Sequence, residues 1–331
     1  MGNALRLDVR GLARLPLAML LGACILAGLT LYWGAGDIMR AVGAAGWGVG
    51  LIVIARYIQV LASGVAWRAV LEASIAWWVC PILRWVREAI NVLLPVAQVG
   101  GDIVGARLLS RRGVKASVAT ASVLADLLVQ VGTQLVFSLL GLFLFWSKSS
   151  DARLVLWLAG GVGLLAIGVA GFLAVQRWGG IAWIEERIGG LVGRNGWTMP
   201  GGIAGLSSSL REIHAAPGRL ALAATIHMAI WIFGASEVWI ACRFIGHPVD
   251  FSAALVIESL SHAARAVFFV IPGGLGIQEG AIVALAATYG LSPQTAVAIG
   301  LLKRIPDIIL GITGLAIWQG IELGWLRAGR A

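Results

Sequence analysis

The chain has 331 residues, of which 59% are hydrophobic and 12% are charged, and its mean hydropathy is +0.90. Soluble domains carry about 25% charged residues, so this composition excludes a soluble globular domain and indicates a membrane protein with several spans. The net charge of +9 does not indicate nucleic-acid binding, because Lys and Arg gather in the cytoplasmic loops of membrane proteins. The cysteines and histidines are scattered, so we expect no metal site, disulfide framework or cofactor.

The apolar runs predict an all-α polytopic fold with six full spans. Each run is long enough for a hydrocarbon core about 30 Å thick, and the runs lie near residues 16–34, 44–70, 115–147, 152–176, 218–245 and 293–320. Basic residues precede the first run, as in a signal peptide, but the run stays apolar as far as Trp33. We therefore interpret it as an uncleaved span.

Two further segments predict broken hairpins within the membrane. In 250–289 an apolar region contains charged residues together with the helix breakers Pro272, Gly273, Gly274 and Gly276. In 80–112 the breakers are Pro95, Gly100 and Gly101. Irregular backbone survives at membrane depth only where protein buries it or where it lines a polar cavity. Each hairpin is either re-entrant or fully spanning, which gives six or eight helices in the membrane with the same remaining topology.

The distribution of Lys and Arg predicts the orientation. With the amino terminus in the cytoplasm, 17 of the 25 basic residues fall in cytoplasmic regions and four in outer loops. This bias places both termini in the cytoplasm of a bacterial inner membrane. The segment 177–217, rich in Gly, Ser and mixed charges, is then a cytoplasmic linker within a single transmembrane domain.

The order of spans and hairpins suggests an internal repeat, with one unit at 44–147 and a second at 218–320. At an offset of 177, Pro95 falls on Pro272 and Asp126 on Lys303, although only six of 39 positions between 95 and 133 are identical. The intervening spans and linker would invert the second unit. Inverted repeats with broken helices that meet at mid-depth are typical of secondary transporters. Coincidence is the alternative, and the repeat predicts that Pro95 and Pro272 lie close together, near Glu88 and Arg265.

Charged residues inside the spans are a functional-site hypothesis by default. Glu258, His262 and Arg265 recur at i, i+4 and i+7 and so share one helix face. We expect a polar cavity between the repeats that accepts a charged or zwitterionic head group. Its candidate residues are Arg87, Glu88, Asp102, Asp126, Gln130, Glu258, His262, Arg265, Gln278, Glu279, Lys303, Arg304 and Asp307.

Mutual pairing is a second interpretation of the same charges, and it is compatible with the first. It predicts that Glu88 pairs with an arginine and Glu279 with Lys303 or Arg304. His227 and Glu237 in the fifth span belong to no recognisable cluster, and we expect them to be isolated.

Two motifs resemble those of the lysylphosphatidylglycerol synthase transmembrane (flippase-type) family. The first comprises 85–88, Leu94-Pro95 and Gly100-Gly101-Asp102, and the second comprises 272–280 with Lys303-Arg304 downstream. The similarity extends over nearly the whole chain and is greatest to the HpnL-type proteins associated with hopanoid biosynthesis. Two-domain members add a cytoplasmic aminoacyl transferase, which this chain lacks, so we do not expect it to synthesise an aminoacyl lipid.

This resemblance implies a membrane lipid substrate, and the leading hypothesis is a lipid translocator. Arg87, Arg265, Lys303 and Arg304 would contact the head group, and one of Asp102, Asp126, Glu279 and Asp307 could carry a coupling proton. One alternative is an intramembrane enzyme acting on a lipid head group. The other is a non-catalytic partner of lipid-biosynthesis enzymes, for which Glu279→Gln or Arg265→Ala would leave function intact. The lipid, its direction of movement and the oligomeric state are not predicted.

Overall fold

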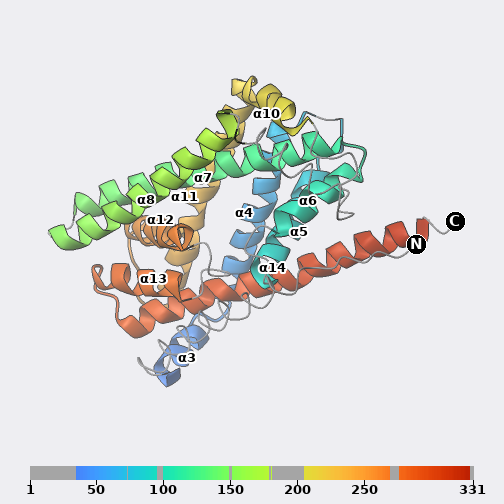
Figure 1. Ribbon diagram of the computed structural model, residues 1–331. Helices are drawn as coiled ribbons and strands as arrows, with labels where there is room; N and C mark the ends of the chain where they lie inside the picture. Colours follow the sequence, from blue (N-terminus) through green and yellow to red (C-terminus); the bar gives the residue numbers. More distant parts are fainter. Residues whose placement is uncertain are drawn as a thin grey trace, which may run out of the picture.

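The computed structural model describes residues 35–72, 74–94, 100–148, 151–178, 180, 205–268 and 276–328, and the described part of the chain is all helical. Pro95, Pro272, Gly273, Gly274 and the predicted first span lie outside these residues. The eleven helices of the described part (Figure 1) are α3 (Ala35–Ala44), α4 (Gly48–Val70), α5 (Val79–Leu93), α6 (Gly100–Ser110), α7 (Ala116–Trp146), α8 (Ala152–Arg177), α10 (Leu206–His214), α11 (Pro217–Ile245), α12 (Phe251–Val267), α13 (Ile277–Ala287) and α14 (Pro293–Ala328).

Four of the predicted spans are confirmed as long apolar helices. Helices α4, α7, α8 and α11 each have the length and hydropathy needed to cross a membrane. The predicted span at 44–70 begins later than expected, because Gly46 has a φ of +46° between α3 and α4. The predicted span at 293–320 corresponds to α14, which continues through Pro306 to Ala328.

Both predicted hairpins consist of two helical arms. Helices α5 and α6 form the first, and α12 and α13 form the second. Gly276 has a φ of +80° and its N–H donates to the Glu279 carboxylate at 2.7 Å, which caps the start of α13. Gly100 and Gly101 are the first residues of α6. Hinge motion at these glycines stays a prediction, as does the choice between re-entrant and spanning hairpins.

The helices contact one another across the two halves of the chain. Helix α4 lies against α11, α5 lies against α14, and α12 lies against α7. Helix α10, within the predicted linker, buries Leu206, Leu210 and Ile213 beside α7. Helix α8 is the least buried of the four apolar helices, and Trp157 and Ile167 on it are largely exposed. These exposed apolar side chains suit contact with lipid hydrocarbon.

The long helix α14 is anchored near its carboxyl end. In Figure 1 it runs from beside α13 to the far end of the molecule. Near its carboxyl end the Glu322 carboxylate accepts hydrogen bonds from Arg107 on α6 and from Arg111, which follows α6. The basic residues at the base of the first hairpin therefore hold the last helix in place.

The close approach of α4 and α5 gives a test of the fold. A Cβ on Gly64 would overlap backbone atoms of Pro81, so we expect Gly64→Ala to destabilise the protein by about 1–3 kcal/mol. Gly50→Ala on the same helix is the matched control, because a Cβ there meets nothing within 4 Å. Melting temperatures in detergent should fall for Gly64→Ala and stay the same or rise for Gly50→Ala. Equal melting temperatures for the two variants would contradict the packing described.

Candidate functional site

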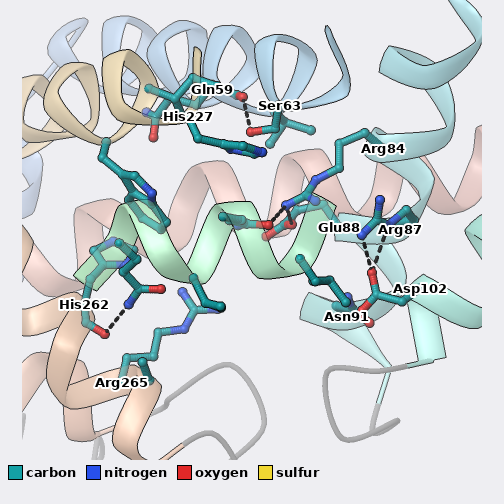
Figure 2. A pocket seen from close by; sticks show the side chains of 18 of the residues that line it. Gln59, Ser63, Arg84, Arg87, Glu88, Asn91, Asp102, His227, His262 and Arg265 are labelled. Atoms are coloured by element: carbon teal, nitrogen blue, oxygen red, sulfur yellow. Dashed lines mark hydrogen bonds and ion pairs between the residues drawn. The ribbon is translucent and has the colours of Figure 1, made fainter. Parts of the chain in front are cut away.

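A cavity of about 390 Å³ lies inside the helical bundle, within the size range of small-ligand pockets. Helices α4, α5, α6, α7, α8, α11 and α12 contribute to its wall. His262 and Arg265 lie on one side of it, and Glu88 and Asp102 lie on another (Figure 2). Its polar lining residues are Arg56, Gln59, Ser63, Arg84, Arg87, Glu88, Asn91, Asp102, Gln130, Gln134, His227, Trp231, His262 and Arg265.

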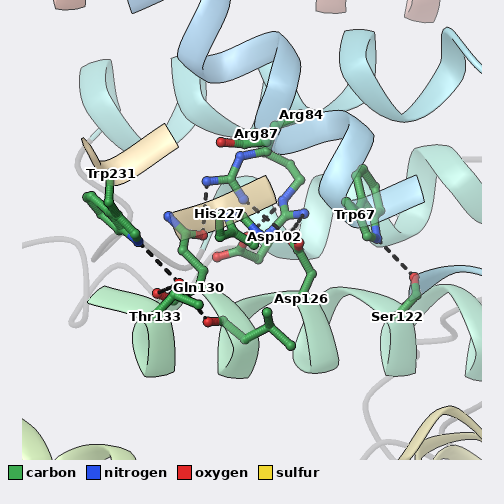
Figure 3. Close-up of polar contacts among 12 residues, drawn as sticks. Trp67, Arg84, Arg87, Asp102, Ser122, Asp126, Gln130, Thr133, His227 and Trp231 are labelled. Carbon is green, nitrogen blue, oxygen red and sulfur yellow. Dashed lines mark hydrogen bonds and ion pairs between the residues drawn. The ribbon is translucent and has the colours of Figure 1, made fainter. Parts of the chain in front are cut away.

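One wall of the cavity is built on a carboxylate without solvent exposure, Asp126 of α7. Arg84 and Arg87 of α5 each donate to Asp126 Oδ2 at 3.3 Å, and His227 Nε2 of α11 lies 3.0 Å from Oδ1 (Figure 3). Arg87 also donates to Asp102 Oδ1 at 2.5 and 2.9 Å. We call this group the Asp126 network: Arg84, Arg87, Glu88, Asp102, Asp126 and His227.

The Asp126 network is completed by weaker contacts on the cavity side. Glu88 lies 3.7 Å from Arg84, and Gln130 accepts a hydrogen bond from Arg84 at 3.0 Å. The Arg87 guanidinium also lies 4.7 Å from the Trp67 ring centroid. Arg87 is thus held on three sides and is 1% exposed, so its geometry is fixed before any ligand arrives.

A second network has the opposite charge at its centre. Lys303 Nζ of α14 donates to both carboxylate oxygens of Glu258 at 2.5 and 2.6 Å and lies 3.3 Å from Glu237 Oε2. His262 Nε2 lies 3.0 Å from Glu258 Oε1. We call this group the Lys303 network: Arg56, Glu237, Glu258, His262, Glu279, Lys303, Arg304 and Asp307.

The remaining members of the Lys303 network extend it along α14 and across to α4. Arg56 donates to Glu237 at 3.0 Å and lies 3.5 Å from Asp307. Arg304 donates to Glu279 at 2.7 Å and lies 3.6 Å from Asp307. Breaking a buried ion pair leaves an uncompensated charge and costs about 3–5 kcal/mol, so both networks hold the helices in register.

Arg265 differs from every other interior cation described here. It lines the cavity, but no carboxylate in the described part of the chain lies within ion-pair distance of it. A guanidinium in this position presents its donors to whatever occupies the cavity.

Most of the predicted site residues are brought together, but they divide into two sets. Six line the cavity, namely Arg87, Glu88, Asp102, Gln130, His262 and Arg265. Six others belong to the networks and do not line it, namely Asp126, Glu258, Glu279, Lys303, Arg304 and Asp307. Gln278 is buried on α13 and lies in neither set.

The predicted pairing of charges is also confirmed in part. Glu279 pairs with Arg304, and Glu88 lies beside Arg84. The expectation that His227 and Glu237 are isolated was wrong, because each joins a network through other helices. Arg56 and Gln59 were not predicted. Arg56 could have been, because it is an ionisable residue inside an apolar run, which is the signal that identified the other charged candidates.

Comparison with known proteins places the chain in a family. A protein-family model described as "Lysylphosphatidylglycerol synthase TM region" matches residues 19–313. The chain belongs to the lysylphosphatidylglycerol synthase transmembrane-region family. Searches of curated proteins and of solved structures found no match.

Membership of the lysylphosphatidylglycerol synthase transmembrane-region family agrees with a multi-pass membrane protein that has a lipid-related function. The family match spans both networks and every residue that lines the cavity. Assignment to the HpnL-type subgroup stays a prediction.

Asp126 provides a test of the first network. Asp126→Asn removes the charge that two arginines share, so we expect a loss of about 3 kcal/mol in stability. Asp151→Asn is the matched control, because Asp151 is an exposed N-cap of α8 and asparagine caps helices about equally well. Thermal unfolding should separate the two variants clearly. If Asp126→Asn has the same melting temperature as Asp151→Asn, the Asp126 network does not stabilise the bundle.

Proposed function

We propose that this protein moves a lipid with a polar head group between the two leaflets of its membrane, as a flippase does. Family membership supports a lipid-related function. The observation that carries the proposal is the cavity-facing Arg265, which has no ion-pair partner among the described residues. A cation in an apolar bundle is costly unless something pairs with it, and a phosphate or another anionic head group would supply that partner.

The chemistry of the cavity suits a head group rather than a whole lipid. Arginine binds phosphate through two parallel N–H donors, and the amides of Gln130 and Gln134 with Asn91 offer further hydrogen bonds. A volume of about 390 Å³ is suited to a small polar group. The acyl or polycyclic tails would remain in the bilayer beside the apolar helices.

An inverted repeat is part of the proposal and would provide the means of transport. Helices α4–α7 and α11–α14 follow the same order of long, short, short and long elements. Their contacts are reciprocal, since α5 lies against α14 and α12 lies against α7. Asp126 and Lys303, 177 positions apart, each form the centre of a network. Rocking of one unit against the other would expose the cavity to alternate leaflets.

The cellular setting rests on the sequence. The bias of Lys and Arg supports a bacterial inner membrane with both termini in the cytoplasm. Resemblance to HpnL-type proteins supports a hopanoid-type lipid as one substrate and lipid-biosynthesis enzymes as partners. The proposed activity leaves the lipid chemically unchanged, so we do not propose an enzyme.

Arg265→Ala tests the proposal directly. In liposomes that contain purified protein and a fluorescent phosphatidylglycerol, we expect wild-type protein to move the lipid between leaflets. The loss of a charge-assisted contact, worth about 1.5–3 kcal/mol, should slow this exchange at least tenfold in Arg265→Ala. The readout is the fraction of label that a membrane-impermeant reductant quenches over time.

Two further variants serve as controls for this experiment. Arg265→Lys should retain part of the activity, and Arg211→Ala, at an exposed position on α10, should behave like wild type. The proposal fails if wild-type protein changes no lipid distribution, or if Arg265→Ala matches Arg211→Ala. A chemically altered lipid in the extract would instead support the intramembrane enzyme.

A further inference from the structure

Two histidines face the cavity in the same manner from different networks. His227 Nε2 lies 3.0 Å from the Asp126 carboxylate, and His262 Nε2 lies 3.0 Å from the Glu258 carboxylate. Both histidines line the cavity. Asp126 and Glu258 are almost fully buried, so each histidine lies between an interior carboxylate and the cavity.

Each network contains one more carboxylate than it has permanent cations. The Asp126 network has Glu88, Asp102 and Asp126 against Arg84 and Arg87. The Lys303 network has four carboxylates against three cations, with Glu237, Glu258, Glu279 and Asp307 facing Arg56, Lys303 and Arg304. An excess charge is unfavourable in a region of low dielectric constant. A proton on the histidine of each network would neutralise that network.

The carboxylates of the two networks are less suitable than the histidines for binding the neutralising proton. The four that the sequence suggested for proton coupling, namely Asp102, Asp126, Glu279 and Asp307, all contact an arginine. Arginine keeps its charge at all accessible pH values, so each of these carboxylates already has a permanent cation beside it. Histidine is the side chain whose charge ordinarily changes between about pH 5 and 8.

In the described part of the chain, no additional unbalanced carboxylate surrounds the two histidines. His262 faces Glu258, Lys303 and Arg265, and its ring meets Trp231 edge to face at 5.3 Å. Around His262, α7 contributes the amide of Gln134, α8 contributes apolar side chains, and Glu279 of α13 is held by Arg304.

The charges around His227 are arranged in the same way. His227 contacts Asp126, and the same carboxylate also contacts Arg84 and Arg87. Arg56 of the neighbouring helix α4 is held by Glu237 and Asp307.

We propose that His227 and His262 form a proton-binding site coupled to the head-group site, which rests on the translocator function proposed above. Counted together, the two networks and the unpaired Arg265 leave the empty cavity with one excess negative charge, so one bound proton gives overall neutrality. An anionic head group takes up the charge of Arg265, and neutrality then requires both histidines to be protonated. Each monoanionic head group therefore enters together with about one proton, whereas a zwitterionic head group enters with none.

Binding calorimetry on the purified full-length protein tests this coupling. Short-chain phosphatidylglycerol is the monoanionic probe and short-chain phosphatidylcholine is the zwitterionic probe, each titrated in buffers of different ionisation enthalpy. We expect uptake of about one proton with the first lipid and none with the second. By linkage, affinity for phosphatidylglycerol should fall about tenfold per pH unit as the histidines lose their protons.

Single substitutions assign the uptake to these residues. In His227→Gln and in His262→Gln, the remaining histidine already carries its proton in the empty site, so uptake should approach zero and affinity for phosphatidylglycerol should fall about tenfold. His247→Gln, in the exposed segment after α11, should match wild type. A purely structural role would weaken both lipids equally and leave the proton count unchanged, which would contradict the proposal.

The other outcomes are equally decisive. Binding of phosphatidylglycerol to wild type without proton uptake overturns the coupling and leaves the translocator function standing. Uptake that persists in the double variant His227→Gln/His262→Gln moves the proton elsewhere and also overturns it. If neither lipid binds wild type, the translocator function itself fails, and the coupling fails with it.

Discussion

A charged side chain inside an apolar bundle needs a partner of opposite charge, and this requirement determines how the helices of this protein meet. Asp126 connects α5, α7 and α11, and Lys303 connects α14, α12 and α11. Helix α11 carries His227 and Glu237, ten residues or about 15 Å apart along its axis, so it belongs to both networks. The cavity lies between these networks, and Arg265 is the interior cation that neither network neutralises.

The helices and the hairpins could be predicted because their signals are local. Long apolar runs predicted α4, α7, α8 and α11. Glycine and proline clusters predicted that each hairpin has two separate helical arms. Charged residues near those breaks were found because ionisable side chains are rare in spans. The separate helix α3 was not foreseen, because most of its residues fall between the predicted spans at 16–34 and 44–70, and a glycine of positive φ divides it from α4.

The ion-pair partners could not be predicted, because they lie on helices that are distant in sequence. Lys303 was one predicted partner of Glu279, whereas Lys303 contacts Glu258 and Glu237. Periodicity shows which residues share a helix face, and only packing shows what that face meets. A single ionisable residue in an apolar helix, such as Arg56, could be recognised as a candidate from the sequence, but its partners could not.

Helix α14 has a mechanical consequence. Arg304, in the first half of α14, holds Glu279 of α13, and Glu322, near the carboxyl end, holds Arg107 of α6. These anchors are 18 residues apart, which is about 27 Å along a continuous helix. The second arms of the two hairpins are therefore attached to one helix, which contains Pro306 between the two anchors. We expect a displacement of α13 that preserves its ion pair to be passed along α14 to α6, on the opposite side of the bundle.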